Sequence, residues 1–343
     1  MIKKYKIAIH HNENSFSVRW IEYCIEQNIS YKIVDCLSRN ILIDLKGCDA
    51  LLWHFNHIQV NQCIQAKTII KDIELSGITV FPNYSSMYHY DNKIAQKKLL
   101  ESINAPLVPT HIFFSKEKAV KWSNSIKYPI VFKLSTGAGS TNVKLVHSQS
   151  ETIKLINKSF DKGHSPLDRN SLFKDRIWHF KRDKNLKSIF GLFKGLVRLF
   201  VPTKFERLSG REKGYIYFQD FIPNNKYDIR IIIIGKKAFA IKRNIRKDDF
   251  RASGSGSIEY NKELFDPRCI EISFEISKKL NFSSMAYDYV FDDLNNPLLV
   301  EISYCFNKDV YYPCPGYWDE NLNWNEGTFK SQDFIIMDII DKL

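Results

Sequence analysis

A glycine-containing segment in the middle of the chain has the composition of a phosphate-binding loop. The strand-like run 129–133 ends in Lys133 and leads into Ser135-Thr-Gly-Ala-Gly-Ser140. Backbone N–H groups of small residues can approach a phosphate closely, and a nearby lysine neutralises its charge. The segment is not a Walker motif, because no Gly-Lys-Ser/Thr sequence follows. It indicates either a phosphate site or an ordinary hairpin turn.

Two carboxylates near the C-terminal end are embedded in apolar strand-like runs. Asp288 lies within Ala-Tyr-Asp-Tyr-Val, and Glu301 follows Pro-Leu-Leu-Val after a turn. A carboxylate is costly to bury unless it is paired or bound to a metal. Mg²⁺ takes oxygen ligands and phosphate, so two such groups on adjacent strands favour a magnesium site. The alternative is a salt bridge to Arg230 or Arg243.

Arg230 and Arg243 lie on two strand-like runs that are joined by a tight turn at Gly235-Lys236. Antiparallel pairing of these runs would bring both side chains near one face of a sheet. A guanidinium group can bind a carboxylate or a phosphate through two parallel hydrogen bonds. The pair therefore indicates an anion-binding site, with a solvated strand face as the alternative.

The strands and helices that must position these residues follow one pattern in residues 1–88 and another in the rest of the chain. Residues 1–88 alternate between strand and helix patterns, which predicts a small Rossmann-like parallel sheet covered by helices. Its strands are expected at 5–9, 31–35, 49–55 and 78–81, and its helices at 15–27 and 59–75. The later patterns predict α+β structure. Its helices are expected at 91–103, 115–125 and 265–280, and its strands at 110–114, 129–133, 142–146, 214–221, 229–234, 237–243, 285–291 and 297–303.

Length and composition narrow the class of protein. The 343 residues suit two or three packed subdomains. We expect an α/β (α+β) chain with an N-terminal domain at 1–88, a central subdomain at 89–218 and a C-terminal subdomain at 219–343. No apolar run is long enough to cross a membrane, and the basic N-terminus lacks the apolar stretch of a signal peptide. The seven cysteines form no Cys-x-x-Cys pair, so we expect no disulfide framework or zinc finger, and a reducing cytoplasm.

In their order along the chain, these parts resemble the ATP-grasp superfamily of carboxylate–amine ligases, which includes glutathione synthetase and the D-alanine–D-alanine ligases. The likeness covers about residues 80–305 and lies in the ordered set of motifs. The matching segments are Asp91-Asn-Lys93, Tyr128-Pro-Ile-Val-Phe-Lys133, Ser135–Ser140, Phe218-Gln-Asp-Phe-Ile222, Tyr227-Asp-Ile-Arg230, Lys242-Arg-Asn244, the loop from Asp249, and the strands with Asp288 and Glu301. The resemblance implies the ATP-grasp fold, in which a first domain precedes two α+β subdomains that clasp ATP.

The resemblance also implies a role for each matching residue. The phosphates of ATP would be bound by Lys93 and Lys133. The mobile glycine-rich loop over them would include Ser135, Gly137, Gly139 and Ser140. Adenine would meet Gln219, Asp220, Phe221 and Ile222. The catalytic residues that hold the reacting carboxylate or acyl phosphate would be Arg230 and Arg243. Two Mg²⁺ ions would be bound by Asp288, Glu301 and Ser303.

One position departs from the family pattern. The usual Glu-x-Asn metal motif reads Glu301-Ile-Ser303 here. A serine hydroxyl is a weaker ligand than an amide carbonyl, and Asn307 is an alternative ligand for the second ion.

The reaction that the resemblance implies is amide formation from a small-molecule carboxylate and an amine, through an acyl phosphate and with release of ADP. The segments 301–306 and 314–320 resemble ATP-grasp proteins that are linked to surface-polysaccharide synthesis, which would imply a sugar or glycan precursor as substrate. Two alternatives stay open. One is a ligase that adds amino acids to a peptide or protein, and the other is a catalytically weak ATP-binding scaffold that docks on a membrane.

A basic insertion at 161–213 lengthens the link between the glycine-rich hairpin and the adenine strand. It contains 14 Lys and Arg and 6 Asp and Glu, and so carries +8 of the net charge of +12. Residues 186–201 place seven apolar side chains on one helical face, with Lys187, Lys194 and Arg198 on another. The apolar face either docks on an anionic membrane, peripherally at its inner face, or packs on this protein or on a second copy in a homodimer. We expect no nucleic-acid partner, because no known recognition motif is present.

Overall fold

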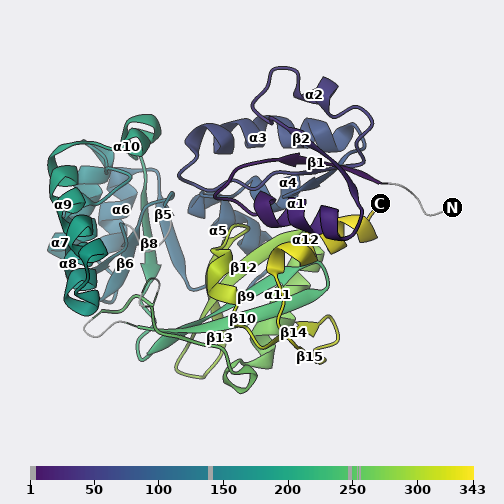
Figure 1. Cartoon of the computed structure of the whole chain (residues 1–343). Coiled ribbons are helices and arrows are strands. Elements are labelled where there is room, and N and C mark those ends of the chain that lie inside the picture. The colour runs from purple at the N-terminus through teal and green to yellow at the C-terminus, as the bar shows by residue number, and fades with distance from the viewer. Residues whose placement is uncertain (1–4, 138–141, 246–248, 253, 255) are drawn as a thin grey trace. The chain divides into compact units, whose positions relative to one another are not determined.

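The computed structural model describes residues 5–137, 142–245, 249–252, 254 and 256–343. The chain forms two compact units (Figure 1). Unit 1 comprises Met1–Tyr90, Ser102–Pro106 and Asn224–Leu343, and unit 2 comprises Asp91–Glu101 and Leu107–Pro223. Both units combine sheets with helices, so the α/β (α+β) class is confirmed. The division into three domains at residues 88 and 218 stays a prediction.

Unit 1 begins with the parallel sheet that the N-terminal pattern predicts. Its strands run in the order β2–β1–β3–β4, and each neighbouring pair is parallel. Their bounds are β1 (Lys6–His10), β2 (Ser30–Val34), β3 (Ala50–Leu52) and β4 (Thr79–Phe81). Parallel strands need crossover connections, which this part of the chain makes with helices. They are α1 (Ser17–Glu26), α2 (Ile41–Asp44) and α3 (Val60–Leu75), and α4 (Tyr84–Met87) follows the sheet.

An antiparallel sheet of unit 1 carries the predicted arginine and carboxylate residues. Its strands run in the order β13–β12–β9–β10–β14–β15, and β11 pairs with β10. Their bounds are β9 (Tyr227–Ile234), β10 (Lys237–Asn244), β11 (Ile258–Glu259), β12 (Ser284–Phe291), β13 (Pro297–Ser303), β14 (Gly316–Asp319) and β15 (Trp324–Glu326). The helices of this part are η1 (Lys262–Leu264), α11 (Pro267–Lys279), η2 (Lys308–Tyr311) and α12 (Ser331–Asp341). The hairpins β9–β10 and β12–β13 confirm the two predicted turns.

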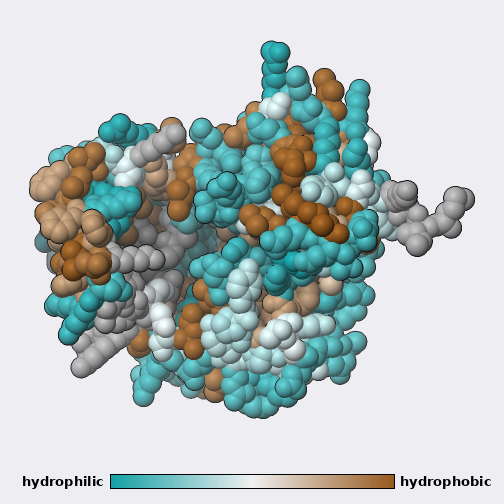
Figure 2. All heavy atoms as spheres, in the orientation of Figure 1, coloured by the Kyte–Doolittle hydropathy of each residue, from teal (hydrophilic) through white to brown (hydrophobic). Residues whose placement is uncertain are grey.

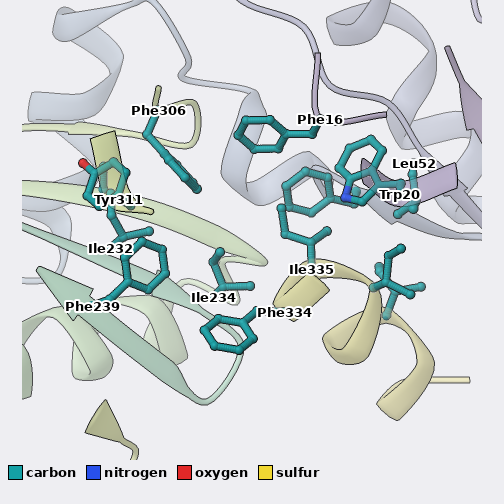
Figure 3. Packing of buried hydrophobic residues seen from close by; sticks show 14 of the residues in the cluster. Phe16, Trp20, Leu52, Ile232, Ile234, Phe239, Phe306, Tyr311, Phe334 and Ile335 are labelled. Atoms are coloured by element: carbon teal, nitrogen blue, oxygen red, sulfur yellow. The ribbon is translucent and has the colours of Figure 1, made fainter. Parts of the chain in front are cut away.

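One apolar core joins the two sheets of unit 1. Phe334 and Ile335 of α12 lie between Trp20 on one side and Ile234 and its neighbours on the other (Figure 3). The Trp20 indole N–H donates to the carbonyl of Gln332 at 3.2 Å. The sequence pattern did not predict α12, because its run Phe334-Ile-Ile-Met is apolar without helical periodicity. The helix is apolar on several sides because most of it is buried.

Unit 2 is built on an antiparallel sheet in the order β5–β8–β6–β7. Its strands are β5 (Thr110–Phe113), β6 (Ile130–Lys133), β7 (Lys144–Val146) and β8 (Ile216–Asp220), and its helices outside the insertion are α5 (Lys93–Ser102), α6 (Lys116–Ser123) and α7 (Gln149–Phe160). Ile130, Phe132, Ile216 and Phe218 pack with Ile156 of α7 into its core. The sheet order places β6, which ends in Lys133, directly beside β8.

The basic insertion forms a helical lobe on unit 2, here called the lobe and defined as residues 165–211. Paired backbone hydrogen bonds between His164 and Glu212 close it, at 2.8 and 2.9 Å. Its helices are α8 (Arg169–Asp183), α9 (Leu186–Phe200) and α10 (Lys204–Ser209). The predicted helix at 186–201 is confirmed, and a capping box of Asn185 and Ser188 begins it. None of the described helices is both long and apolar enough to cross a lipid bilayer.

Candidate active-site residues

On unit 2, the predicted phosphate lysine and the predicted adenine strand are in direct contact. Lys133 ends β6 and is buried, and its Nζ donates to Oε1 of Gln219 on β8 at 2.5 Å. The Gln219 amide in turn donates to the hydroxyl of Thr110 on β5 at 3.1 Å. Asp220 ends β8, with its Oδ1 2.9 Å from Nε2 of His111, and Phe221 and Ile222 follow. Neighbouring strands of one sheet thus bring these residues together.

The start of the glycine-containing segment is tied to the start of α5. The Lys93 backbone N–H donates to the carbonyl of Ser135 at 2.9 Å, and its Nζ donates to the carbonyl of Gly137 at 2.7 Å. The Gly137 N–H donates to Oδ1 of Asp91 at 2.6 Å. Gly137 has a φ of 95°, which glycine adopts without strain. Lys93, Ser135 and Gly137 are therefore close together, whereas Gly139 and Ser140 lie outside the described residues.

Two residues that hold this segment, Glu212 and Tyr215, were not predicted from the sequence. The Ser135 N–H lies within hydrogen-bonding distance of Tyr215 Oη at 2.7 Å and of Glu212 Oε2 at 3.1 Å. The hydroxyl groups of Thr136 and Tyr215 also donate to the Glu212 carboxylate. Burial raises the pKa of Tyr215, and the charge of Glu212 raises it further. No sequence pattern predicts that Glu212 and Tyr215 contact Ser135, because these residues are far apart in the chain. Glu212 also pairs with His164 where the lobe closes.

On unit 1, two arginines and two aspartates form a compact cluster, in which Arg243 and Asp288 are buried and Arg230 and Asp228 are half-buried. Arg230 donates to both carboxylate oxygens of Asp288, at 2.5 and 2.6 Å. Arg243 donates to both oxygens of Asp228, each at 2.6 Å, and its Nη2 lies 3.1 Å from Asp288. The salt bridge that the sequence left as an alternative for Asp288 is thus present. The two positive and two negative charges balance one another.

The cluster shifts the ionisation of Asp288. Burial by itself raises the pKa of this carboxyl, but the charges of Arg230 and Arg243 outweigh burial and hold the pKa well below its ordinary value. Asp288 therefore stays ionised whenever the protein is folded near neutral pH.

Asp288 also has a second cross-strand neighbour, Glu301. In the sheet register Asp288 of β12 lies opposite Arg230 on β9 and opposite Glu301 on β13. Residues directly opposite in an antiparallel pair belong to the same face of the sheet. An arginine and two carboxylates thus form a row across three adjacent strands.

Sequence comparisons match part of the chain. Residues 91–185 match the family model described as the ATP-binding domain of the carbamoyl-phosphate synthase L chain. Among curated proteins, biotin carboxylase 2, chloroplastic, from Populus trichocarpa is 24% identical over 97 residues, which are 28% of this chain and 18% of that protein. The chain therefore matches less than a fifth of the length of that relative.

Solved structures are similar over nearly the whole chain. A RimK domain ATP-grasp protein from Sphaerobacter thermophilus has a TM-score of 0.55 at 13% identity, over 98% of this chain and 99% of that one. This chain has the ATP-grasp fold. The biotin carboxylase domain of 2-oxoglutarate carboxylase from Hydrogenobacter thermophilus has a TM-score of 0.57 at 14% identity, over 97% and 69%. D-alanine–D-alanine ligase from Bacillus anthracis has a TM-score of 0.52 at 14% identity, over 88% and 86%.

The carboxylates of this ATP-grasp chain fit a magnesium ion that is shared with a phosphate ligand. Within the described residues, no three His, Cys, Asp or Glu side chains gather into a metal site. Mg²⁺ commonly uses one or two protein carboxylates and takes its other oxygens from water and substrate phosphate. The roles of Asp288 and Glu301 as metal ligands stay predictions.

The third predicted ligand is engaged elsewhere. Ser303 ends β13, and its hydroxyl donates to the carbonyl of Cys305 at 2.9 Å. Asn307, the alternative ligand, accepts a hydrogen bond from the N–H of Asp309 at 3.2 Å and so caps η2. Neither contact supplies evidence for a second ion, and the metal role of Ser303 stays a prediction.

Ser303→Asn is expected to keep turnover, because an amide oxygen is a better ligand than a hydroxyl and the amide N–H can still donate to Cys305. Ser303→Ala, the matched control, removes the oxygen. We expect it to raise the Mg²⁺ concentration for half-maximal ADP release by about tenfold. An equal rise in the Mg²⁺ concentration for half-maximal ADP release in the two variants would contradict a ligand role for position 303.

Proposed function

We propose that this protein is an ATP-dependent carboxylate–amine ligase that forms an amide bond and releases ADP and phosphate. The observation that carries the proposal is the match of residues 91–185 to an ATP-binding domain, within a chain of ATP-grasp fold. Two structural neighbours support it by their names. One is a D-alanine–D-alanine ligase complexed with ATP, and the other is a carboxylase domain complexed with MgADP.

The proposed chemistry follows from the weakness of a carboxylate as an electrophile. Transfer of the terminal phosphoryl group of ATP to the carboxylate makes an acyl phosphate and leaves ADP. The amine then attacks the carbonyl carbon, the C–O bond to phosphate breaks, and the amine loses a proton. Phosphoryl transfer depends on positioning and on positive charge more than on a nucleophilic side chain.

We assign the binding roles by unit. On unit 2, the phosphates of ATP are bound by Lys93, Lys133 and the segment from Ser135, and adenine is bound at Gln219–Ile222. On unit 1, Arg230 and Arg243 hold the carboxylate or acyl phosphate through their guanidinium N–H groups. We assign Mg²⁺ to Asp288 and Glu301, where the ion would supply positive charge.

The decisive experiment measures ADP release and traps the intermediate. Purified protein with ATP and Mg²⁺ is screened against sugar acids and amino acids, with hydroxylamine in place of the amine. Carboxylate-dependent ADP release together with a hydroxamate product is expected, since hydroxylamine attacks an acyl phosphate. ATP turnover that no carboxylate stimulates would favour the weak ATP-binding scaffold instead.

Lys133→Met is expected to weaken ATP binding by about 10- to 100-fold, because a charge-assisted hydrogen bond to phosphate contributes roughly 1.5–3 kcal/mol. Methionine keeps most of the side-chain volume, so the core of unit 2 should be preserved. Isothermal titration with ATP measures the effect, and Lys127→Met, an exposed position just before β6, is the control. Unchanged affinity in Lys133→Met would refute its assignment to phosphate.

For the substrate we propose a sugar or glycan precursor. This proposal rests on the resemblance of residues 301–306 and 314–320 to proteins of surface-polysaccharide synthesis. The same screen distinguishes this class of substrate from amino acids that are added to a peptide or protein.

We also propose a cytoplasmic location. The support is the sequence, whose seven cysteines form no Cys-x-x-Cys pair, as expected for a reducing compartment. Assembly as a homodimer stays a prediction.

A further inference from the structure

The apolar face of α9 is exposed. Phe193 and Phe200 are 67% and 79% exposed, and Leu186, Phe190 and Val197 are similarly open. Figure 2 shows the resulting hydrophobic patch over the helices of the lobe. No described part of the chain covers these side chains, so packing on the protein's own body does not explain them. A patch of large apolar groups in water marks a surface that another body covers.

The packing of the lobe explains why this face points outward. α9 turns Gly195 toward α8, and its exposed phenylalanines lie on the other side of the helix. A Cβ atom at Gly195 would lie 2.6 Å from Arg176 Cδ and 3.0 Å from Phe173 Cδ2, so a larger residue would force these side chains to move. Arg176 donates to the carbonyl of Gly191 at 2.5 Å. The contact uses the side of α9 opposite the large side chains, which leaves them exposed.

The surface around the patch is positively charged. From Lys184 to Lys204 the sequence contains five Lys or Arg residues and no acidic residue. Lys194 and Arg198 are exposed and lie beside the apolar stripe in the helical repeat. Among the described side chains, neither forms an ion pair with a carboxylate. The nearby carboxylates of Asp168 and Glu206 already pair with Lys144 and Arg169, at 3.1 and 2.7 Å.

We propose that the lobe docks the protein on a membrane surface that contains anionic lipids, with α9 lying in the interface. The large apolar side chains enter the acyl boundary, while Lys194 and Arg198 meet the lipid phosphates. The helix has 15 residues, too few to span a bilayer, so the contact is peripheral. This inference does not depend on the proposed ligase activity, because it uses only the lobe.

Two other partners fit the patch less well. In a twofold contact between two copies, Lys194 and Arg198 would face their own counterparts or lie close to them, and like charges repel. A nucleic acid offers phosphates to the cations but does not cover a stripe of Phe and Leu. An anionic lipid surface supplies both the apolar phase and the negative charge.

Vesicle sedimentation tests the proposal directly. The full chain is mixed with vesicles of phosphatidylcholine alone, or of phosphatidylcholine with phosphatidylglycerol, and centrifuged at low and at high salt. We expect it to pellet with the anionic vesicles, to pellet less at high salt because charges are screened, and to remain in solution with neutral vesicles. No pelleting with anionic vesicles at low salt overturns the proposal.

Paired variants locate the contact on α9. Phe193→Ser with Phe200→Ser, and separately Lys194→Gln with Arg198→Gln, should each weaken vesicle binding by roughly tenfold or more. The apolar control is Leu75→Ser with Leu294→Ser, which are 77% and 83% exposed outside the lobe. The charge control is Arg39→Gln with Lys46→Gln, both exposed on unit 1. Equal losses in the variants and their controls would overturn the assignment to α9.

Two further readouts separate the remaining explanations. ATP binding should be unchanged in the Phe193→Ser, Phe200→Ser variant, since both side chains are exposed and far in sequence from Lys133. Light scattering without lipid should give the same mass for this variant and the parent protein. A dimer that the phenylalanine substitutions dissociate would assign the patch to a second copy and overturn the membrane proposal.

Discussion

Asp288→Asn is expected to lower the free energy of unfolding by about 3–5 kcal/mol, because it removes the buried carboxylate that Arg230 and Arg243 share. Arg230 makes a bidentate pair with this carboxylate, and Arg243 lies 3.1 Å from it. The substitution changes charge and hardly changes volume, so the loss is electrostatic. Urea denaturation near neutral pH measures it. The sequence alone would suggest a change in metal binding without damage to the fold.

The control for this substitution is an exposed ion pair. Lys236 and Glu320 lie 2.9 Å apart, and both are exposed, so Glu320→Gln should leave the free energy of unfolding nearly unchanged. If Asp288→Asn and Glu320→Gln cost the same, the cluster does not stabilise the fold.

The pH dependence of the Asp288→Asn effect has a definite sign. The folded-state pKa of Asp288 lies below its unfolded value of about 3.9, so its stabilising contribution is present above that value. The contribution is lost as the pH falls toward the folded-state pKa. The difference in unfolding free energy between parent and variant should be constant above about pH 5 and shrink below about pH 4.

Glu301→Gln is expected to reduce turnover by about 100-fold or more while leaving stability nearly unchanged. Glu301 is half-buried and lies opposite Asp288, so removing its charge relieves a like-charge contact and weakens the proposed magnesium site. Initial rates of ADP release over a range of Mg²⁺ concentrations measure the effect.

The Glu301→Gln experiment needs a control variant that removes a different carboxylate of unit 1, away from the proposed magnesium site. Glu271→Gln is suitable, because this residue is exposed on α11. Full turnover in Glu301→Gln, at every Mg²⁺ concentration, would remove this residue from the metal site. A loss of both turnover and stability would instead show that Glu301 supports the fold.

Local sequence was sufficient to predict the strands and turns that hold the candidate residues. The apolar run that ends in Lys133 forms β6, and the runs on either side of Gly235 form the hairpin β9–β10. The short turn between β12 and β13 also makes these strands neighbours, but a β-bulge between Asp288 and Tyr289 shifts the register and places Glu301 opposite Asp288. Strand alternation and tight turns are properties of neighbouring residues, so a single sequence can specify them.

Only the tertiary structure decided which charged groups meet. Arg230 and Asp288 are 58 residues apart, and Glu212 is 77 residues from Ser135. No local pattern specifies that β9 pairs with β12, because strand order depends on how the whole sheet is buried.

The tertiary structure also decided which face of α9 points outward. Its apolar stripe by itself suggests an inward face, but Gly195 allows the side chains of α8 to approach closely on the other side. The helix therefore packs on its small residues and leaves its large apolar side chains exposed to whatever binds them.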